Sequence, residues 1–258
     1  MILVAACGDV TGTSAPAAGT AAVISQVLDG DSVRVLLDGV DAEVRLMGIN
    51  APEQDECYTL RSQKALETLL SRGAVTVTTV ATDQFGRQLG YVRAGDEDVN
   101  LTMVQQGAAL ALDNDHDRAL RYLAAEEKAV AAGLGMWAPN ACGPPTEGFT
   151  IAEVRANPPG RDEDSLDGEW VDIANSGPAA VNLTDWRLRD ESSTNRYRFP
   201  TGFVIEAGAG VRVVVGCGTD DAATVYWCSP APVWNNGGDT ALLLDASGNI
   251  AARLRYDG

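Results

Sequence analysis

The sequence is poor in histidine, in long apolar runs and in positive charge. Its 258 residues include one histidine, His116, so histidine-based acid–base chemistry and multi-histidine zinc sites have little support. His116 stands between two aspartates just before a predicted helix, where we expect a solvated position. No apolar run approaches the ~20 residues that span a bilayer, so the sequence offers no candidate transmembrane helix.

Acidic residues outnumber basic residues in both halves of the chain. Asp and Glu total 36 against 19 Lys and Arg, which gives a net charge of −17 at pH 7. Residues 20–138 hold 10 basic and 18 acidic residues, and residues 139–258 hold 9 and 17. Proteins that bind phosphate backbones usually present basic surfaces and gain affinity by releasing counterions. By charge alone, neither half is an obvious nucleic-acid module.

The first residues suggest export. The segment Met1-Ile-Leu-Val-Ala-Ala-Cys7 is apolar and ends in small residues before a cysteine, and a stretch of small and polar residues follows it. This pattern resembles the end of a bacterial lipoprotein signal peptide, whose cysteine takes a lipid, although no positive charge precedes it. Residues 1–19 are therefore interpreted as a signal remnant and flexible tether, with Cys7 as the lipidation candidate and the only contact with a membrane. A disordered N-terminus with an incidental cysteine is the alternative.

The remaining cysteines also favour export, to the cell surface or the medium. Their number is even, as expected for two disulfides. Cys217 and Cys228 lie close enough in sequence to form a local bridge, and Cys57 and Cys142 would then tie an early loop to the end of the first domain. Four free buried thiols remain the alternative, because a sequence does not establish proximity.

Residues 20–138 mix strands and helices. Apolar and β-branched runs predict five strands, and the apolar spacing of other segments predicts one inserted helix and two terminal helices. We expect strands at 22–28, 33–37, 43–49, 74–80 and 89–93, and helices at 62–71, 99–107 and 117–132. This order suits a five-stranded OB-type β-barrel with helices.

A second domain of mainly β structure follows a linker at residues 139–146, where Pro and Gly are frequent. Short apolar stretches separated by Gly, Asn and Asp turns predict seven or eight strands within residues 147–258. They lie near 149–155, 170–174, 186–188, 197–199, 211–215, 241–244 and 250–256. This pattern indicates an antiparallel β-sandwich.

Four blocks in residues 20–138 occur in an order that is typical of one family. They are Val27-Leu-Asp-Gly-Asp-Ser-Val33, Val44-Arg-Leu-Met-Gly-Ile-Asn-Ala-Pro-Glu53, Asp83-Gln-Phe-Gly-Arg-Gln-Leu-Gly-Tyr91 and Val99-Asn100. Together they resemble the thermonuclease, or staphylococcal nuclease, family. The resemblance implies a Ca²⁺-dependent phosphodiester hydrolase, an endonuclease that acts on DNA or RNA.

The resemblance implies a role for each matching residue. Arg45 and Arg87 match phosphate-binding arginines, whose guanidinium groups donate two hydrogen bonds and stay charged. Glu53 matches the carboxylate that activates water. The implied calcium ligands are Asp31, Asn50 and the main-chain carbonyl of Ala51, with Asp29 in the outer shell. Taken singly, each of these residues could be an ordinary solvated or turn residue.

Two departures from the family pattern affect residues that would bind the metal and the substrate. Asn50 replaces an aspartate, which keeps an oxygen ligand but removes one negative charge. Gln84 replaces a lysine in the substrate-binding region, and the segment 110–115 lacks the expected tyrosines. Phe85 is then the candidate aromatic contact for the substrate.

Residues 147–258 resemble a lamin-tail domain, which implies an immunoglobulin-like sandwich. The matching blocks are 151–157, 169–175, 181–186 and 233–240. The tryptophans Trp170, Trp186 and Trp234 are expected to pack in its core. The partner of this domain is unknown, and a binding or targeting role follows from the resemblance alone.

The sequence leaves two functional hypotheses open. The first is a secreted or surface-anchored Ca²⁺-dependent nuclease that uses Arg45, Glu53 and Arg87. The second is a non-catalytic, surface-attached binding module on a nuclease-like barrel, and the acidic composition, Asn50 and the missing tyrosines favour it.

Overall fold

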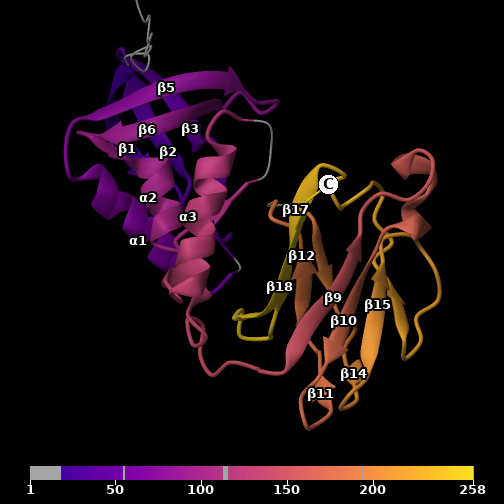
Figure 1. The fold of residues 1–258 in the computed structure, drawn as a ribbon. Coiled ribbons are helices and arrows are strands. Elements are labelled where there is room, and N and C mark those ends of the chain that lie inside the picture. The colour runs from indigo at the N-terminus through magenta and orange to yellow at the C-terminus, as the bar shows by residue number, and fades with distance from the viewer. Residues whose placement is uncertain (1–18, 55, 113–115, 193, 258) are drawn as a thin grey trace, which may run out of the picture.

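The structure consists of two β-rich bodies, a barrel followed by a sandwich, that meet along one side (Figure 1). It is a computed structural model that describes residues 19–54, 56–112, 116–192 and 194–257. The lipidation candidate Cys7 and nearly all of the expected tether lie outside the described residues. Within those ranges, no helix is long and apolar enough to cross a membrane.

The barrel body alternates strands with helices in the order expected from the sequence. Its strands are β1 (Thr20–Val27), β2 (Ser32–Leu37), β3 (Val40–Leu46), β4 (Ile49–Asn50), β5 (Val75–Thr82), β6 (Gln88–Ala94), β7 (Glu97–Asp98) and β8 (Leu110–Ala111). Its helices are α1 (Thr59–Leu70), α2 (Val99–Gln105) and α3 (Ala119–Ala131), and the short helix η1 (Gly135–Trp137) follows.

Five of these strands close into a barrel. The antiparallel order β3-β2-β1-β5-β6 is closed by a parallel pairing of β3 with β6, so the predicted five-stranded barrel is confirmed. Closure pairs the edges that an open sheet would leave free. Val33, Val35 and Val44 are fully buried, since alternate residues of a strand point to the inside.

A tight turn between β2 and β3 fixes the register in which these two strands pair. Asp38 and Gly39, between β2 and β3, have φ angles of +49° and +82°. Two successive residues with positive φ are typical of the type I′ turns that join two-residue hairpins. This turn pairs Ser32 at the start of β2 with Arg45 near the end of β3.

The sandwich body contains two four-stranded sheets and one small two-stranded pair. One sheet has the order β16-β15-β10-β9, the other β13-β12-β17-β18, and β11 pairs with β14. The strands are β9 (Phe149–Arg155), β10 (Trp170–Asn175), β11 (Val181–Asn182), β12 (Arg187–Arg189), β13 (Arg196–Arg198), β14 (Val204–Ile205), β15 (Gly210–Val214), β16 (Thr224–Tyr226), β17 (Gly238–Leu244) and β18 (Ile250–Asp257). Two 3-10 turns, η2 (Asp162–Asp164) and η3 (Leu166–Gly168), precede β10.

The sandwich agrees with the sequence except in two respects. The edge strand β16 pairs in parallel with β15, so the expectation of a purely antiparallel sandwich is wrong. The two-residue strands β11 and β14 are also too short to give a periodic signal. Trp186 and Trp234 pack in the core as expected. Trp170 is buried as well, and the Arg212 guanidinium carbon lies 3.5 Å from its ring centre.

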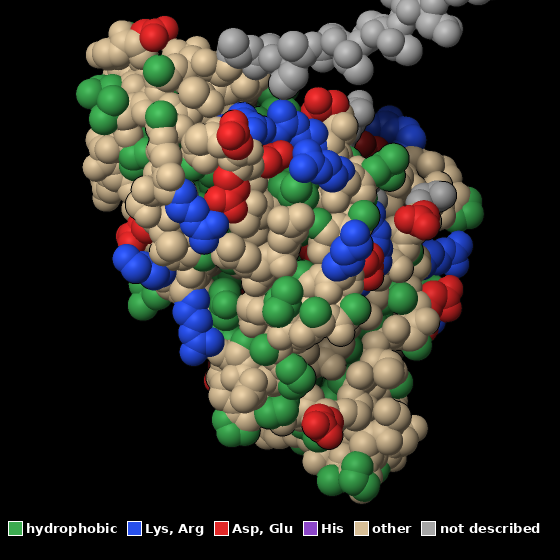
Figure 2. All heavy atoms as spheres, turned by 60° about the vertical axis from the view of Figure 1, so that its left-hand side comes forward, with side chains coloured by type: hydrophobic (Ala, Val, Ile, Leu, Met, Phe, Trp, Pro, Cys, Tyr) green, Lys and Arg blue, Asp and Glu red, His purple; other side chains and the backbone are tan. Residues whose placement is uncertain are grey.

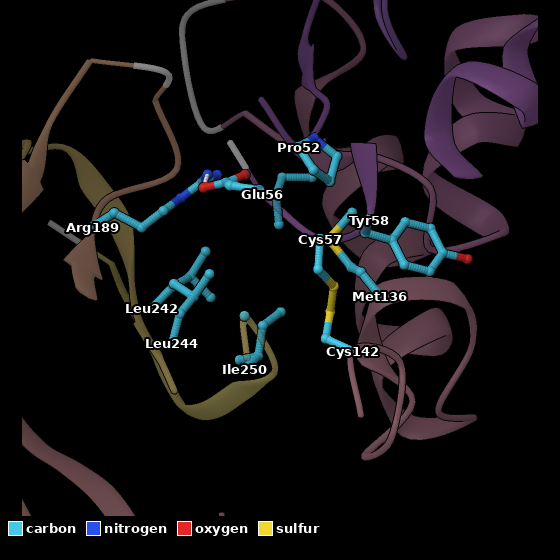
Figure 3. A pocket seen from close by; sticks show the side chains of 12 residues that line it. Pro52, Glu56, Cys57, Tyr58, Met136, Cys142, Arg189, Leu242, Leu244 and Ile250 are labelled. Atoms are coloured by element: carbon cyan, nitrogen blue, oxygen red, sulfur yellow. Dashed lines mark hydrogen bonds and ion pairs between the residues drawn. A yellow bond between two sulfur atoms is a disulfide. The ribbon is translucent and has the colours of Figure 1, made fainter. Parts of the chain in front are cut away.

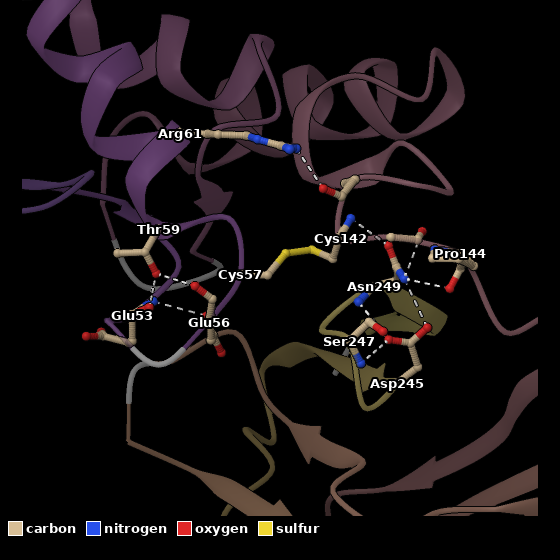
Figure 4. Close-up of a disulfide and its surroundings, with 12 residues drawn as sticks. Glu53, Glu56, Cys57, Thr59, Arg61, Cys142, Pro144, Asp245, Ser247 and Asn249 are labelled. Atoms are coloured by element: carbon tan, nitrogen blue, oxygen red, sulfur yellow. Dashed lines mark hydrogen bonds between the residues drawn. A yellow bond between two sulfur atoms is a disulfide. The ribbon is translucent and has the colours of Figure 1, made fainter.

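Both expected disulfides are present. Cys57 bonds to Cys142 across 85 residues of sequence, and Cys217 bonds to Cys228 across 11. The first bridge lies beside the turn that joins β17 to β18 (Figure 4). There the amide of Cys142 donates to Asn249 Oδ1 at 2.8 Å. The disulfide thus fastens the segment between the bodies to the barrel, and this hydrogen bond fastens it to the sandwich.

The two bridges should contribute unequally to stability. Loop entropy gives about 4.5 kcal/mol for a loop of the length closed by Cys57 and Cys142, and about 3 kcal/mol for the shorter one. We therefore expect Cys57→Ser/Cys142→Ser to lower the midpoint of urea unfolding more than Cys217→Ser/Cys228→Ser. Equal shifts, or a larger shift from the shorter loop, would contradict this expectation.

Candidate functional site

The guanidinium of Arg45 lies at the centre of a buried polar cluster. Its Nη2 is 3.0 Å from Asp31 Oδ2 and 2.9 Å from Asn50 Oδ1, and its Nη1 donates to the carbonyl of Ile49 at 2.8 Å. Asp31 and Asn50 are 4% and 1% exposed. Strands β2, β3 and β4 thus bring three of the residues predicted from the sequence into direct contact.

Asp31 is the most heavily bonded carboxylate of this cluster. Besides Arg45, it accepts hydrogen bonds from the amide of Ala51 at 2.5 Å and from Ser32 Oγ at 2.9 Å. Its own amide donates to Asp29 Oδ1 at 2.9 Å, which turns Asp29 toward the same site. Burial raises the pKa of Asp31 to about 7, although Arg45 opposes this shift.

Arg87 lies in the turn just before β6, the strand that pairs in parallel with β3. Arg45 pairs with Leu89 in this contact, and Arg87 stands two residues before Leu89. Arg87 Nε donates to Asp83 Oδ2 at 2.7 Å and is about one third exposed, so it remains accessible to a ligand.

The turn between β5 and β6 also carries the two substrate-binding candidates. Phe85 is 75% exposed, and the Arg87 guanidinium lies 5.6 Å from its ring centre. Gln84 is exposed in the same turn. The segment after β8 that lacks tyrosines falls partly on residues 113–115, which lie outside the described residues.

Glu53 lies after β4, where the chain turns into α1. Its main-chain carbonyl accepts a hydrogen bond from Thr59 Oγ1, and its amide donates to Glu56 Oε2 at 3.1 Å. Burial raises the pKa of the Glu53 carboxyl. The strongest opposing charge is Arg196, from the sandwich, and Arg45 acts in the same direction.

The outer face of the β13-β12-β17-β18 sheet rests on the barrel. Alternate residues of β17 belong to the sandwich core, whereas Leu242 and Leu244 point out of it. These two leucines form an apolar cluster with Leu110 and Met136 of the barrel body. Figure 3 shows them across a cavity of about 30 Å³ at the contact between the two bodies.

Ion pairs flank this apolar cluster on two sides. Glu56 of the barrel accepts from Arg189 Nη1 at 2.5 Å and lies 3.5 Å from Arg196 Nη2. Elsewhere along the contact, Arg253 of β18 pairs with Glu126 of α3 at 2.8 Å. Buried charges need such partners, because an unpaired buried charge is costly.

The hairpin between β12 and β13 reaches the Arg45 cluster itself. Asn50 Nδ2 donates to the main-chain carbonyl of Glu191 at 3.1 Å, across 141 residues of sequence. The Asn50 side chain therefore has both ends engaged, its oxygen by Arg45 and its nitrogen by the sandwich. A carboxylate in place of this amide would set two acceptors against each other.

Comparison with known proteins identifies both bodies. Residues 43–139 match the family model described as staphylococcal nuclease homologue, and residues 144–258 match the lamin tail domain. Protein ParB of Escherichia coli is 34% identical over 125 residues, which cover 44% of this chain and 70% of that protein. The chain belongs to the staphylococcal nuclease family.

Two other relatives of the staphylococcal nuclease domain have names that denote a nuclease. A protein named uncharacterized endonuclease of Haemophilus influenzae is 35% identical over 119 residues, 45% of this chain and 66% of its own length. The thermonuclease of Staphylococcus intermedius is 29% identical over 130 residues, 46% of this chain and 77% of its own length. The chain thus spans about two thirds to three quarters of these relatives, and the alignments cover less than half of this chain.

Among the described residues, no three His, Cys, Asp or Glu side chains gather to hold a metal ion, so a hard cation near Arg45 would depend on a mixed carboxylate and amide set. Asp31 Oδ2 and Asn50 Oδ1 both lie within 3.0 Å of one positively charged nitrogen, Arg45 Nη2, so they already share a cation. Carboxylate, amide and main-chain carbonyl oxygens are the ligands that calcium prefers. Asp31, Asn50 and the carbonyl of Ala51 are the residues that would hold it.

Sequence reasoning missed the contribution of the second domain and misplaced one residue. Glu56, Glu191 and Arg196 adjoin the site, yet none lies in a block that marks the staphylococcal nuclease family. His116, expected in solvent, is half-buried and contacts Tyr91, whose hydroxyl lies 3.1 Å from His116 Nδ1. Its ring fills the space left by the missing side chain of Gly48.

The amide of Asn50 gives a stability prediction. Asn50→Asp should lower the free energy of unfolding in chelator by about 1–3 kcal/mol, because the Glu191 carbonyl would lose its donor and face a carboxylate oxygen instead. Asn182→Asp is the matched control, since the side-chain oxygen of Asn182 accepts from Thr184 at an exposed position. Stability equal to or above that of the wild type in urea unfolding would contradict this role of Asn50.

A buried carboxyl beneath the hairpin gives a pH prediction. Burial, together with the charge of Asp190, raises the pKa of Asp239 from its ordinary 3.8 to about 7. The folded state then binds the proton more tightly, so this stabilisation is complete below pH 3.8 and is lost as the pH rises through 7. On its own, Asp239 should make the free energy of unfolding fall by about 2–3 kcal/mol from pH 5 to pH 8, and Asp31, whose pKa is raised to a similar value, adds to this fall. Asp239→Asn should remove the share of Asp239 and leave that of Asp31, and an unchanged fall in the variant would refute the assignment.

Proposed function

We propose that this chain is a Ca²⁺-dependent nuclease that hydrolyses phosphodiester bonds of DNA or RNA. The observation that carries the proposal is the Arg45 cluster: a guanidinium held between Asp31 and Asn50, with Glu53 in electrostatic contact. Membership of the staphylococcal nuclease family supports it, as do relatives that are named thermonuclease and endonuclease.

In this proposal, the two arginines neutralise the charge that builds up on the phosphoryl oxygens. A guanidinium donates two hydrogen bonds to phosphate in a fixed geometry and does not lose its proton. The carbonyl of Ile49 and the side chain of Asn50 fix Arg45, so it is oriented before substrate arrives. Arg87 exchanges the carboxylate of Asp83 for a phosphate, and its exposure allows this.

Glu53 orients the attacking water and accepts its proton. Its raised pKa makes it a stronger base than an exposed glutamate, which suits proton transfer near neutral pH. The hydrogen bonds of its main chain to Thr59 and Glu56 hold the turn that presents it. When bound, calcium would supply further positive charge to the phosphate.

The protein acts outside the cell or at its surface. Two disulfides support this location, because such bonds persist in oxidising compartments. Cys7 remains the candidate for a lipid anchor.

Replacement of the three proposed catalytic residues tests the function. With Ca²⁺ present, Arg45→Ala, Arg87→Ala and Glu53→Gln should each lower the rate of cleavage of denatured DNA by about 10²–10⁴-fold. Arg72→Ala is the matched control, since its guanidinium pairs with Glu97 at 2.9 Å elsewhere on the barrel. It should keep the wild-type rate.

Cleavage at the wild-type rate by Arg45→Ala or Arg87→Ala would overturn the assignment. Absence of cleavage by the wild-type chain, with nucleic acid still bound, would favour the non-catalytic binding module. The engagement of both arginines by carboxylates, Asp31 and Asp83, is the observation that favours this second function.

A further inference from the structure

Four arginines stand opposite one another on the hairpin formed by β12 and β13. Arg187 pairs with Arg198, and Arg189 pairs with Arg196, in the antiparallel register of the two strands. These four residues, called here the arginine ladder, are nearly half of the nine basic residues in residues 139–258. The positive charge of an acidic domain is therefore concentrated on one hairpin.

All four side chains belong to one face of the sheet. Leu188 and Tyr197, which alternate with the arginines, lie in the core of the sandwich. The arginine ladder therefore projects from the outer face, the face that also rests on the barrel. On the face of the molecule in Figure 2, basic and acidic side chains are interspersed.

The inner pair of the arginine ladder, Arg189 and Arg196, adjoins the candidate nuclease site. Arg189 is 3% exposed and contacts Glu56, and Arg196 is the strongest charge that acts on Glu53. The hairpin also holds Asn50 through the carbonyl of Glu191. The arginine ladder is therefore continuous with the place where the scissile phosphate would bind.

The outer pair of the arginine ladder, Arg187 and Arg198, lies farther from this site and closer to solvent. The Arg198 side chain is 61% exposed, and its partner Asp185, at 3.5 Å, is 63% exposed. An ion pair between two such exposed groups is weak, so a phosphate can replace the carboxylate. Like charges placed directly opposite each other across two strands also destabilise a sheet, and an anionic ligand relieves that repulsion.

We propose that the arginine ladder of the lamin tail domain is a binding site for the backbone phosphates of a single-stranded nucleic acid that extends out of the nuclease site. The proposal rests on the proposed nuclease function, because the nuclease site fixes the direction from which the nucleic acid reaches the arginine ladder. It gives the second domain a substrate-binding role and explains how an acidic chain holds a polyanion. The chemistry is that of guanidinium and phosphate, without base recognition.

The test measures binding rather than cleavage. A fluorescently labelled 15-nucleotide single-stranded DNA is titrated with the full chain in excess chelator, at salt concentrations from 50 to 300 mM, and anisotropy is recorded. We expect Arg198→Gln to weaken binding about 3–10-fold and to lower the slope of log K against log salt by about 0.7. Arg198→Lys should keep the slope, because it keeps the charge.

Arg161→Gln is the matched control. It removes the same charge from an exposed side chain, 76% accessible, that lies beside Glu163 and Asp164 rather than on the hairpin. It should bind as the wild type does, and equal losses for Arg161→Gln and Arg198→Gln would overturn the proposal. Unchanged binding by Arg198→Gln would also overturn it, whether or not the chain cleaves DNA, since the assay does not depend on catalysis.

Discussion

One buried ion pair, between Arg45 and Asp31, constrains the rest of the candidate site. Each charge removed from water costs several kcal/mol unless hydrogen bonds replace the lost solvent. The amide of Ala51, the hydroxyl of Ser32 and the carbonyl of Ile49 supply these bonds. The site lies where the starts of β2 and β4 meet the end of β3, because these three groups converge there.

The need of buried polar groups for hydrogen-bond partners also connects the two domains. Asn50 completes the Arg45 cluster with its oxygen and engages the sandwich with its nitrogen, so both domains fix the position of its side chain. Glu56 of the barrel likewise pairs with Arg189 of the sandwich, and an apolar cluster lies between the two ion-paired edges of the contact. Residues of the lamin tail domain therefore form one side of the candidate site.

The sequence predicts the parts of this site that are close along the chain or on neighbouring strands. The block from Val44 to Glu53 places Arg45, Asn50 and Ala51 within one strand and turn, and the Asp38-Gly39 turn fixes their register with Asp31. These relations follow from local geometry, so motif and turn chemistry suffice to predict them.

The contacts made by the sandwich could not be predicted in this way. Glu191 meets Asn50 only because two separately folded sheets dock in one orientation, and no local rule determines that orientation. Alternating arginines in Arg187–Arg189 and Arg196–Arg198 do signal a charged sheet face. The half-buried position of His116 depends on Gly48, which is 68 residues away and equally invisible to periodicity.

If the Arg45 cluster supports calcium-dependent phosphodiester hydrolysis, as proposed, the rate of cleavage must depend on free Ca²⁺. The most direct measurement is the initial rate of cleavage of a labelled oligonucleotide by the wild-type full chain, recorded as free Ca²⁺ is raised from excess chelator to millimolar levels. The account predicts negligible cleavage in chelator and a rate that saturates with Ca²⁺. A rate that is independent of Ca²⁺, or no cleavage at any Ca²⁺ concentration, would contradict it.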